Sequence, residues 1–177
     1  MRWIEGLLDL LYPRECCVCG KILEIGEKFL CNECHDDIPF TYYWSWMENP
    51  AEKKLWGRVY LERVIPLFFY SRESKYINLV HRIKYRGDIP LAHHLGKMLG
   101  EKILVAGIDV DVIVPVPLHW RKRWKRGYNQ AEQIAIGVAS ALFGENSRTK
   151  ICTKSLYRKT YTATQTKQSV SDKWKNV

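Results

Sequence analysis

The chain has 177 residues, a formal net charge of +9 and 46% hydrophobic residues. This composition is typical of a folded globular protein and excludes a disordered or fibrous chain. No apolar run approaches the roughly 18 residues that a membrane-spanning helix needs. We therefore expect one domain, or one domain with a small module, and no transmembrane segment.

Charge is distributed unevenly along the chain. Residues 1–57 hold 6 basic and 10 acidic residues, whereas residues 58–177 hold 22 basic and 9 acidic residues. This asymmetry predicts two parts, the second of which faces an anionic partner such as a phosphorylated metabolite, a nucleic acid or an acidic protein. Lysines that only keep the surface soluble are the alternative.

The first residues differ from a secretion signal, because Glu5 and Asp9 interrupt the apolar stretch and no small-residue cleavage site follows. Apolar residues recur at helical spacing from Trp3 to Leu11, and Pro13 ends the pattern. We expect a short amphipathic helix that packs on its own protein. A weak role at a membrane surface is the alternative, but the polar face is acidic rather than basic.

Two Cys-x-x-Cys pairs lie close together. The first pair is Cys16 and Cys19, and the second is Cys31 and Cys34. Two such pairs on facing turns present four thiolates to one zinc ion and leave no open position for catalysis. The spacing therefore predicts a structural zinc site with these four ligands. Two disulfides, or Cys17 in place of Cys16, are the alternatives.

The remaining chain divides into an aromatic segment and a stretch of alternating elements. Residues 36–57 are rich in Tyr and Trp, which indicates a linker or small subdomain that packs on the rest. Apolar patterns then predict strands over 59–70, 112–114 and 151–157, and helices over 75–86, 91–103 and 131–143. Alternating strands and helices are typical of a parallel α/β sheet.

We expect a basic loop after the predicted strand over 112–114. Five cations precede a helix that is predicted to begin near Tyr128: Arg121, Lys122, Arg123, Lys125 and Arg126. Anions bind beyond the carboxyl ends of parallel strands and at helix N-termini. The segment predicts a phosphate or pyrophosphate site, in which Gly127 allows close backbone approach and Asn129 and Gln130 donate hydrogen bonds or cap the helix. A solvated basic loop is the alternative.

The run Val114-Pro-Val-Pro-Leu followed by Arg126-Gly-Tyr-Asn-Gln resembles the signature of the ComF family of competence-associated, phosphoribosyltransferase-like proteins. Three further features agree with that family. They are the N-terminal four-cysteine module, the turn Lys84-Tyr-x-Gly, and the segment Arg158-x3-Thr162-x2-Gln165-Thr. The resemblance covers essentially the whole chain in the family's order.

The resemblance implies a zinc-binding module with an N-terminal helix and aromatic linker (residues 1–57) ahead of a type I phosphoribosyltransferase-like α/β domain (residues 58–177). It implies that residues 117–130 contact pyrophosphate and that a loop near 158–168 closes over the site. Arg126 and Arg158 are the candidate catalytic residues, which would stabilise departing charge. The implied ligand-binding residues are Arg123, Arg126, Gly127, Tyr128, Asn129, Gln130, Thr162, Gln165 and Thr166.

One motif that the resemblance implies is missing. Family members carry an Asp-Asp pair and a Thr-Thr-Gly-like turn that hold the ribose and 5′-phosphate of phosphoribosyl pyrophosphate. The only Asp-Asp here is Asp36-Asp37, inside the cysteine module. We therefore expect a chain that is truncated before this motif, lacks the last strands of its sheet and is inactive as a phosphoribosyltransferase. Mg²⁺ is expected only where the full catalytic domain exists.

Two functions are consistent with these residues. The first is a phosphoribosyltransferase-like protein of the competence type, and the second is a non-catalytic component of a DNA-uptake machine that docks proteins or binds single-stranded nucleic acid. Aromatic residues suited to stacking on bases are Trp120, Trp124, Tyr128, Tyr157 and Tyr161. The expected partners are phosphoribosyl pyrophosphate or another phosphorylated ligand, single-stranded DNA, and DNA-uptake proteins. The expected location is the cytoplasm, at the inner face of the membrane through such partners.

Overall fold

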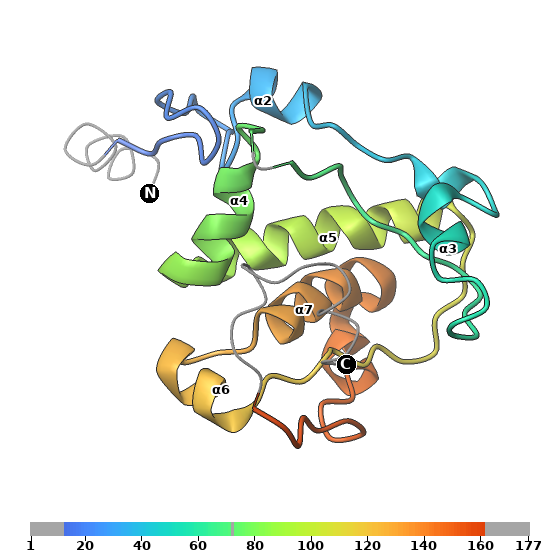
Figure 1. The fold of residues 1–177 in the computed structure, drawn as a ribbon. Helices are drawn as coiled ribbons and strands as arrows, with labels where there is room; N and C mark the ends of the chain where they lie inside the picture. The colour runs from blue at the N-terminus through green and yellow to red at the C-terminus, as the bar shows by residue number, and fades with distance from the viewer. Residues whose placement is uncertain (1–12, 72, 162–177) are drawn as a thin grey trace.

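The computed structural model describes residues 13–71 and 73–161, and helices dominate this part of the chain (Figure 1). The helices are α2 (Asn32–Asp36), η1 (Tyr43–Ser45), α3 (Pro50–Lys53), α4 (Ile77–His81), the π-helix η2 (Arg82–Arg86), α5 (Ile89–Val105), α6 (Trp120–Arg126), α7 (Gln130–Phe143) and η3 (Gly144–Lys150). The predicted N-terminal helix over Trp3–Leu11 lies outside the described residues. None of the described helices combines the length and apolar character of a membrane span.

Helices α5 and α7 lie side by side at the centre of the molecule (Figure 1). Glycines allow this close approach. A Cβ atom on Gly96 would lie 2.2 Å from the carbonyl oxygen of Ile134, and one on Gly137 would lie 2.2 Å from the carbonyl oxygen of His93. Any larger residue at these positions would force the two backbones apart. The crossing therefore fixes α7, and the segment that leads into it, against α5.

Local signals set the helix ends. Asp88 caps α5 by accepting a hydrogen bond from the Leu91 N–H, and Asn129 caps α7 by accepting one from the Ala131 N–H. Gly87 ends η2 with a φ of 72°, a conformation that glycine adopts at little cost. The helices predicted over 75–86, 91–103 and 131–143 are confirmed, with ends that differ by a few residues.

The predicted parallel α/β sheet is wrong. The described residues contain no strand and form isolated bridges, one of them a parallel bridge between Ile113 and Ile151. Ile113 makes both backbone hydrogen bonds of this bridge, at 2.8 and 2.9 Å. Pro115 and Pro117 follow and have no N–H with which to continue a ladder. The strands predicted over 59–70, 112–114 and 151–157, and the phosphoribosyltransferase-like sheet built on them, are therefore corrected to extended segments.

The basic segment that the sequence pattern predicted as a loop is the helix α6. His119 caps it, because its Nδ1 atom accepts a hydrogen bond from the Arg121 N–H at 3.3 Å. Gly127 ends it with a φ of 79°. Lys and Arg are good helix formers, and the two tryptophans are the only apolar residues of α6, too few to form the apolar stripe that marks a longer helix. The cations are consequently arranged on the faces of a helix.

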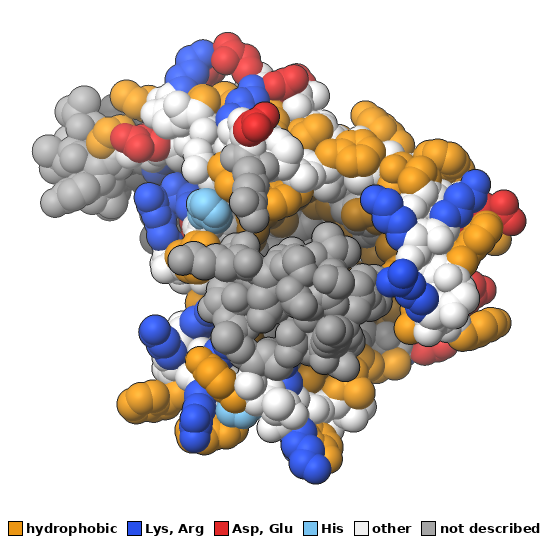
Figure 2. Space-filling model, viewed as in Figure 1, with side chains coloured by type: hydrophobic (Ala, Val, Ile, Leu, Met, Phe, Trp, Pro, Cys, Tyr) orange, Lys and Arg blue, Asp and Glu red, His pale blue; other side chains and the backbone are white. Residues whose placement is uncertain are grey.

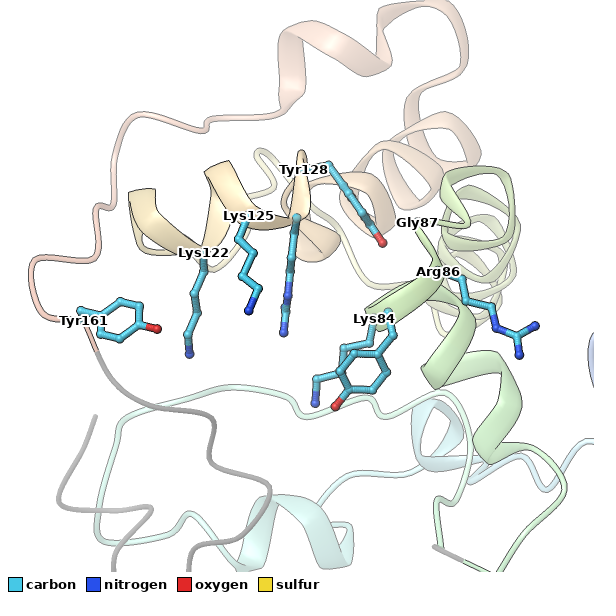
Figure 3. A pocket seen from close by; sticks show the side chains of 9 residues that line it. Lys84, Arg86, Gly87, Lys122, Lys125, Tyr128 and Tyr161 are labelled. Carbon is cyan, nitrogen blue, oxygen red and sulfur yellow. The ribbon is translucent and has the colours of Figure 1, made fainter.

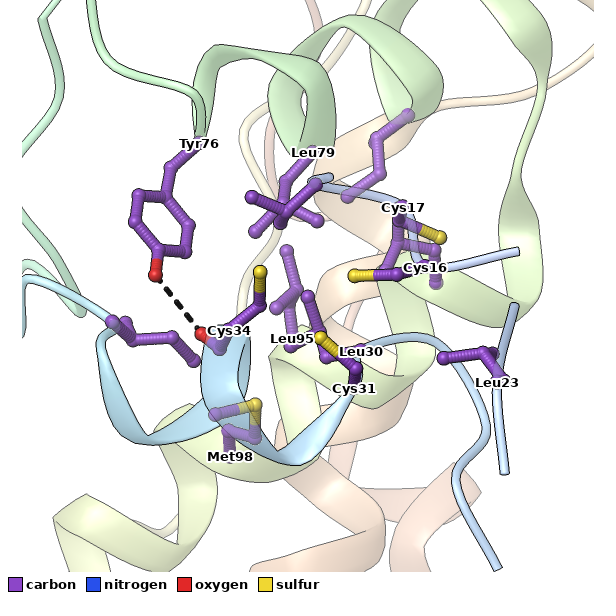
Figure 4. Packing of buried hydrophobic residues seen from close by; sticks show 14 of the residues in the cluster. Cys16, Cys17, Leu23, Leu30, Cys31, Cys34, Tyr76, Leu79, Leu95 and Met98 are labelled. Atoms are coloured by element: carbon purple, nitrogen blue, oxygen red, sulfur yellow. Dashed lines mark hydrogen bonds between the residues drawn. The ribbon is translucent and has the colours of Figure 1, made fainter. Parts of the chain in front are cut away.

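The hydrophobic core joins the cysteine module to α4 and α5 (Figure 4). Leu30 of the module is buried together with Leu79 of α4 and Leu95 of α5. The hydroxyl of Tyr76 donates a hydrogen bond to the carbonyl oxygen of Cys34 at 3.0 Å. The module therefore supports the helical segment from which η2 continues. The proposed boundary between residues 57 and 58 stays a prediction.

A cluster of hydrogen-bonded polar side chains holds the aromatic segment over residues 36–57 in place. Asn49 is fully buried, caps α3 and donates hydrogen bonds to Glu52 Oε1 at 2.7 Å and to the carbonyl oxygen of Val64 at 3.0 Å. Arg63 donates to the same Glu52 oxygen at 3.3 Å and to the carbonyl oxygen of Trp44 at 3.2 Å. This group connects α3 to the extended chain that follows it.

Candidate functional site

The four predicted zinc ligands come together. The Sγ atoms of Cys16, Cys19, Cys31 and Cys34 all lie within 4.8 Å of one another, and Cys19 Sγ is 3.7 Å from Cys31 Sγ. In a tetrahedral site with Zn–S bonds of about 2.3 Å, neighbouring sulfurs are about 3.8 Å apart. Both the spacing and the donor chemistry therefore fit zinc.

Two tight turns build this cluster. In the first, the Gly20 N–H donates to the carbonyl oxygen of Cys16 at 3.0 Å, with Gly20 at a φ of 76°. In the second, Cys31 lies directly before α2 and Cys34 lies in the first turn of that helix. Cys16, Cys31 and Cys34 are buried, whereas Cys19 is exposed. Short-range backbone geometry thus places the two sulfurs within each pair, and the hydrogen bond from the Cys17 N–H to the carbonyl oxygen of Phe29, at 2.8 Å, joins the two turns.

The thiols of the cluster differ in acidity. Burial raises the pKa of Cys16, but hydrogen bonds from the backbone at Cys19, Cys31 and Val18 outweigh this effect and bring the pKa to about 6. Burial and hydrogen bonds with the other thiols raise the pKa of Cys34. Zinc requires thiolates, so binding of the metal releases the protons that the cluster holds.

The other two cysteines lie outside this group of sulfurs. Cys17 is buried in the core beside the cluster, and burial raises its pKa (Figure 4). Cys152 lies next to the Ile113–Ile151 bridge, with its sulfur 2.7 Å from Ser155 Oγ. Cys16 rather than Cys17 contributes to the four-sulfur arrangement.

A cleft of about 490 Å³ lies between η2 and α6 (Figure 3). Lys84 extends into it from η2, and Lys122 and Lys125 extend into it from α6, while Arg86 points away from them (Figure 3). The cleft is lined by Lys84, Tyr85, Arg86, Gly87, Lys122, Lys125, Arg126, Tyr128 and Tyr161. All five charged side chains in this lining are cationic, so the cleft, which we call the cationic cleft, favours an anion.

The cations of this cleft repel one another. The pKa of Lys122 is lowered, first by burial and then by the positive charges of Arg158, Arg126 and Lys84. An anionic ligand that enters the cleft would reduce this repulsion between the cations.

The two walls of the cleft are joined by hydrogen bonds. The Tyr128 hydroxyl donates to the carbonyl oxygen of Ile83, and Gln130 Nε2 donates to the carbonyl oxygen of Lys84 at 3.2 Å. Arg126 in turn donates to Gln130 Oε1 at 2.8 Å. These bonds attach the Arg-Gly-Tyr-Asn-Gln motif to η2, a π-helix of the kind that is frequent at functional sites.

The predicted ligand-binding residues therefore divide into two groups. Arg126 and Tyr128 line the cleft, and Gln130 bonds to its wall. Asn129 is buried, caps α7 and donates to the carbonyl oxygen of Val116 at 3.0 Å, so its side chain is used within the fold.

The remaining predicted residues lie elsewhere. Arg123 projects from the other side of α6 and lies 3.5 Å from Glu132. Gly127 forms the end of α6. Arg158 lines a separate pocket beside Pro117 and Tyr157, so the two candidate catalytic arginines face different hollows. Thr162, Gln165 and Thr166 lie outside the described residues.

Sequence reasoning did not assign a ligand role to Lys84 or Tyr85, and it counted Lys122 and Lys125 among the cations of the predicted phosphate site without naming them as individual ligands. Lys84 and Tyr85 belong to the Lys-Tyr-x-Gly turn. In the sequence this turn is only a feature shared with the ComF family, and it predicts no ligand contact. Lys122 and Lys125 are three residues apart, and in a helix this spacing places them on one face together with Arg126. The spacing could therefore have indicated that these three cations face the same site.

Comparison with known proteins supports the zinc site. Residues 7–43 match the double zinc ribbon domain family. Together with the four-sulfur cluster, this match supports a structural zinc ion in the N-terminal part of the chain.

The chain is also similar to proteins named DNA utilization protein YhgH. It is 28% identical to the protein from Escherichia coli (strain K12) over 122 residues, which cover 66% of this chain and 50% of that protein. It is 35% identical to the Salmonella typhimurium protein over 66 residues, which cover 34% and 29% of the two chains. The chain thus spans half the length of the first relative and less than a third of the second. No solved structure matches. These findings support the relationship to ComF proteins that the motifs predict.

Proposed function

We propose that this protein binds single-stranded DNA in the cationic cleft, as a DNA-handling component related to DNA uptake. The observation that carries this proposal is the convergence of Lys84 from η2 with Lys122, Lys125 and Arg126 from α6 on one cleft. The similar proteins from two bacterial genera are named for DNA utilization, which favours DNA as the polyanion.

The lining of the cleft suits a single strand better than a duplex. Proteins that bind single strands combine a cationic groove for the backbone with aromatic side chains for the bases. Tyr85 and Tyr161 line the cleft and are 58% and 51% exposed, so their rings are accessible beside the cations. In a duplex the base faces are stacked on one another and unavailable to such rings.

The zinc module has a supporting role in this proposal. Tyr76 binds the Cys34 carbonyl oxygen, and Leu79 of α4 packs in the core that contains the cysteines. Because η2 continues directly from α4, the module helps to fix the wall that presents Lys84. Zinc is structural here and takes no part in ligand binding.

Phosphoribosyl pyrophosphate is the second candidate ligand, because the same cations would bind a pyrophosphate group. The charged lining of the cleft is wholly cationic and includes no carboxylate for ribose hydroxyls. The sequence also has no Thr-Thr-Gly turn, and its only Asp-Asp pair lies in the zinc module. We therefore propose binding, rather than phosphoribosyl transfer, as the activity of these 177 residues.

Fluorescence anisotropy with a labelled 20-nucleotide oligo-dT tests the proposal. Lys84→Gln and Lys125→Gln should each weaken binding by about two- to fivefold, the range expected from removal of one exposed ion pair. Lys97→Gln removes the same charge from an exposed position on α5 and should bind as the wild type does. Equal affinities for all four proteins would overturn the cleft as the DNA site. Displacement of the oligonucleotide by micromolar phosphoribosyl pyrophosphate would favour the second candidate.

A further inference from the structure

The face of α6 that is turned away from the cleft carries two exposed tryptophans. Trp120 is 66% exposed and Trp124 is 88% exposed. A spacing of four residues places them on one face of the helix. With Arg123 and Gly127 they line a hollow that shares no lining residue with the cationic cleft. In Figure 2, hydrophobic and basic side chains lie next to one another in the region where Figure 1 places α6.

The hollow between these rings is open. Gly127 forms part of its lining, and a Cβ atom at this position would meet nothing within 4 Å. Large aromatic rings that lie next to one another and are exposed on a protein surface are typical of binding sites. The Trp124 ring is therefore open to a planar ligand, and the Trp120 ring is open on the side that neither Arg121 nor His119 covers.

Cationic side chains also lie between the cleft face and the tryptophan face of α6. Arg121 is exposed, and its guanidinium carbon lies 5.1 Å from the ring centroid of Trp120 and 5.9 Å from that of Tyr161, which lines the cleft. The seven residues of α6 include five cations and no acid. A polyanion that enters the cleft thus meets a continuous positive surface around the helix as far as the tryptophans.

We infer that Trp120 and Trp124 form a base-stacking subsite for single-stranded DNA. This inference rests on the proposed function. The strand passes over α6, with its phosphates at Lys122 and Lys125 and its bases against the two indole rings. Charge complementarity favours nucleic acid as the occupant, because it joins a phosphate backbone to flat aromatic bases, and α6 offers five cations together with two aromatic rings. Stacking of this kind tolerates any base sequence, since every base has a flat face.

Three probes of equal length separate stacking from charge. They are a labelled oligo-dT, an oligonucleotide without bases on the same phosphate backbone, and a duplex. Stacking raises the affinity by a factor of about 5 to 150 for each stacked base. The wild type should therefore bind oligo-dT at least fivefold more tightly than the abasic strand, and more tightly than the duplex.

Trp120→Ala and Trp124→Ala should each reduce this preference, the remainder coming from Tyr85 and Tyr161 in the cleft, while they leave affinity for the abasic strand unchanged. Trp124→Phe should restore part of the preference, because a smaller ring still stacks. Trp56→Ala is the matched control, because Trp56 is 53% exposed in the segment after α3 and far from α6 in sequence. Lys125→Gln should weaken binding of both strands equally. Zinc content and circular dichroism confirm that each variant is folded.

Two results would overturn the inference. In the first, both tryptophan variants keep the wild-type ratio of oligo-dT to abasic affinity. In the second, the variants lose binding to an acidic peptide or to anionic vesicles while this ratio is unchanged, which would assign the tryptophan face to another partner. Failure of the wild type to bind any of the three probes would instead overturn the proposed function itself, so the two failures are distinguishable.

Discussion

The hydroxyl of Tyr128 donates a hydrogen bond to the carbonyl oxygen of Ile83, 45 residues earlier in the chain. Ile83 lies inside the π-helix η2, and Tyr128 follows directly after the end of α6. One contact thus joins the two elements that supply the cations of the cleft. It also gives a structural reason for the tyrosine in the Arg-Gly-Tyr-Asn-Gln motif.

Tyr128→Phe should weaken DNA binding although it removes no charge. The substitution keeps the ring and deletes one hydrogen bond, which contributes about 1 kcal/mol. We expect η2 to present Lys84 less well and the affinity for oligo-dT to fall about two- to fivefold. Anisotropy at constant salt measures this loss.

A double-mutant cycle distinguishes positioning from a general loss of stability. In the Tyr128→Phe background, Lys84→Gln should cost little further affinity, because Lys84 is already misplaced. Lys125→Gln lies on the other wall and should keep its full effect. Additive effects for both lysines would contradict a positioning role for Tyr128.

Gly96→Ala and Gly137→Ala should destabilise the fold. Each added Cβ atom would meet a backbone carbonyl oxygen at 2.2 Å, so α5 and α7 must separate. Overpacking of this kind costs about 1–3 kcal/mol. Urea denaturation measures the loss, with Glu101→Ala at an exposed position of α5 as the control. A midpoint equal to that of the control would show that the helices cross differently.

Cys31→Ser should lose the bound zinc, about one equivalent per chain for a four-thiolate site. The variant should also unfold at a lower temperature than the wild type, because the metal is linked to folding. Cys17→Ala and Cys152→Ser should keep their zinc, since neither sulfur belongs to the cluster. Metal analysis of the purified proteins checks both statements. Loss of zinc from Cys17→Ala with retention in Cys16→Ala would reverse the assignment of the first ligand.

Glu52 should make the protein sensitive to acid. Burial alone would raise its pKa, but hydrogen bonds from the backbone N–H groups of Val64 and Asn49, and the charge of Arg63, hold the pKa below its ordinary value. The stabilisation is present above the unfolded pKa, near 4.3, and is lost as the pH falls through the lower folded pKa.

Glu52→Gln should therefore be less stable than the wild type at pH 7, and the difference should shrink toward pH 3. Urea midpoints at the two pH values measure this change. A difference that is constant with pH would contradict the role of the Glu52 charge.

Local patterns explain what the sequence predicted well. The Cys-x-x-Cys pairs need only tight turns to bring their sulfurs together, so their spacing was sufficient. The helices α5 and α7 have apolar residues at helical spacing, and the capping residues Asp88 and Asn129 mark where each begins.

Non-local contacts explain what the sequence did not predict. The apolar run over 112–114 has the composition of a strand, but a sheet needs partners, and Pro115 and Pro117 end the pairing after one bridge. Helix α6 is short, and its only apolar residues, Trp120 and Trp124, are too few to indicate a helix in the sequence. The cationic cleft depends on the contact between Tyr128 and Ile83, which no periodicity in either segment indicates.

The salt dependence of DNA binding tests the cationic cleft most directly. If Lys84, Lys122, Lys125 and Arg126 each neutralise one phosphate, the logarithm of the binding constant for oligo-dT should fall with the logarithm of salt concentration with a slope of roughly −3. The Lys84→Gln/Lys125→Gln double variant should reduce the magnitude of this slope by about 1.4, and Lys97→Gln should leave it unchanged. A double variant with the wild-type slope would contradict the claim that these lysines hold the DNA backbone.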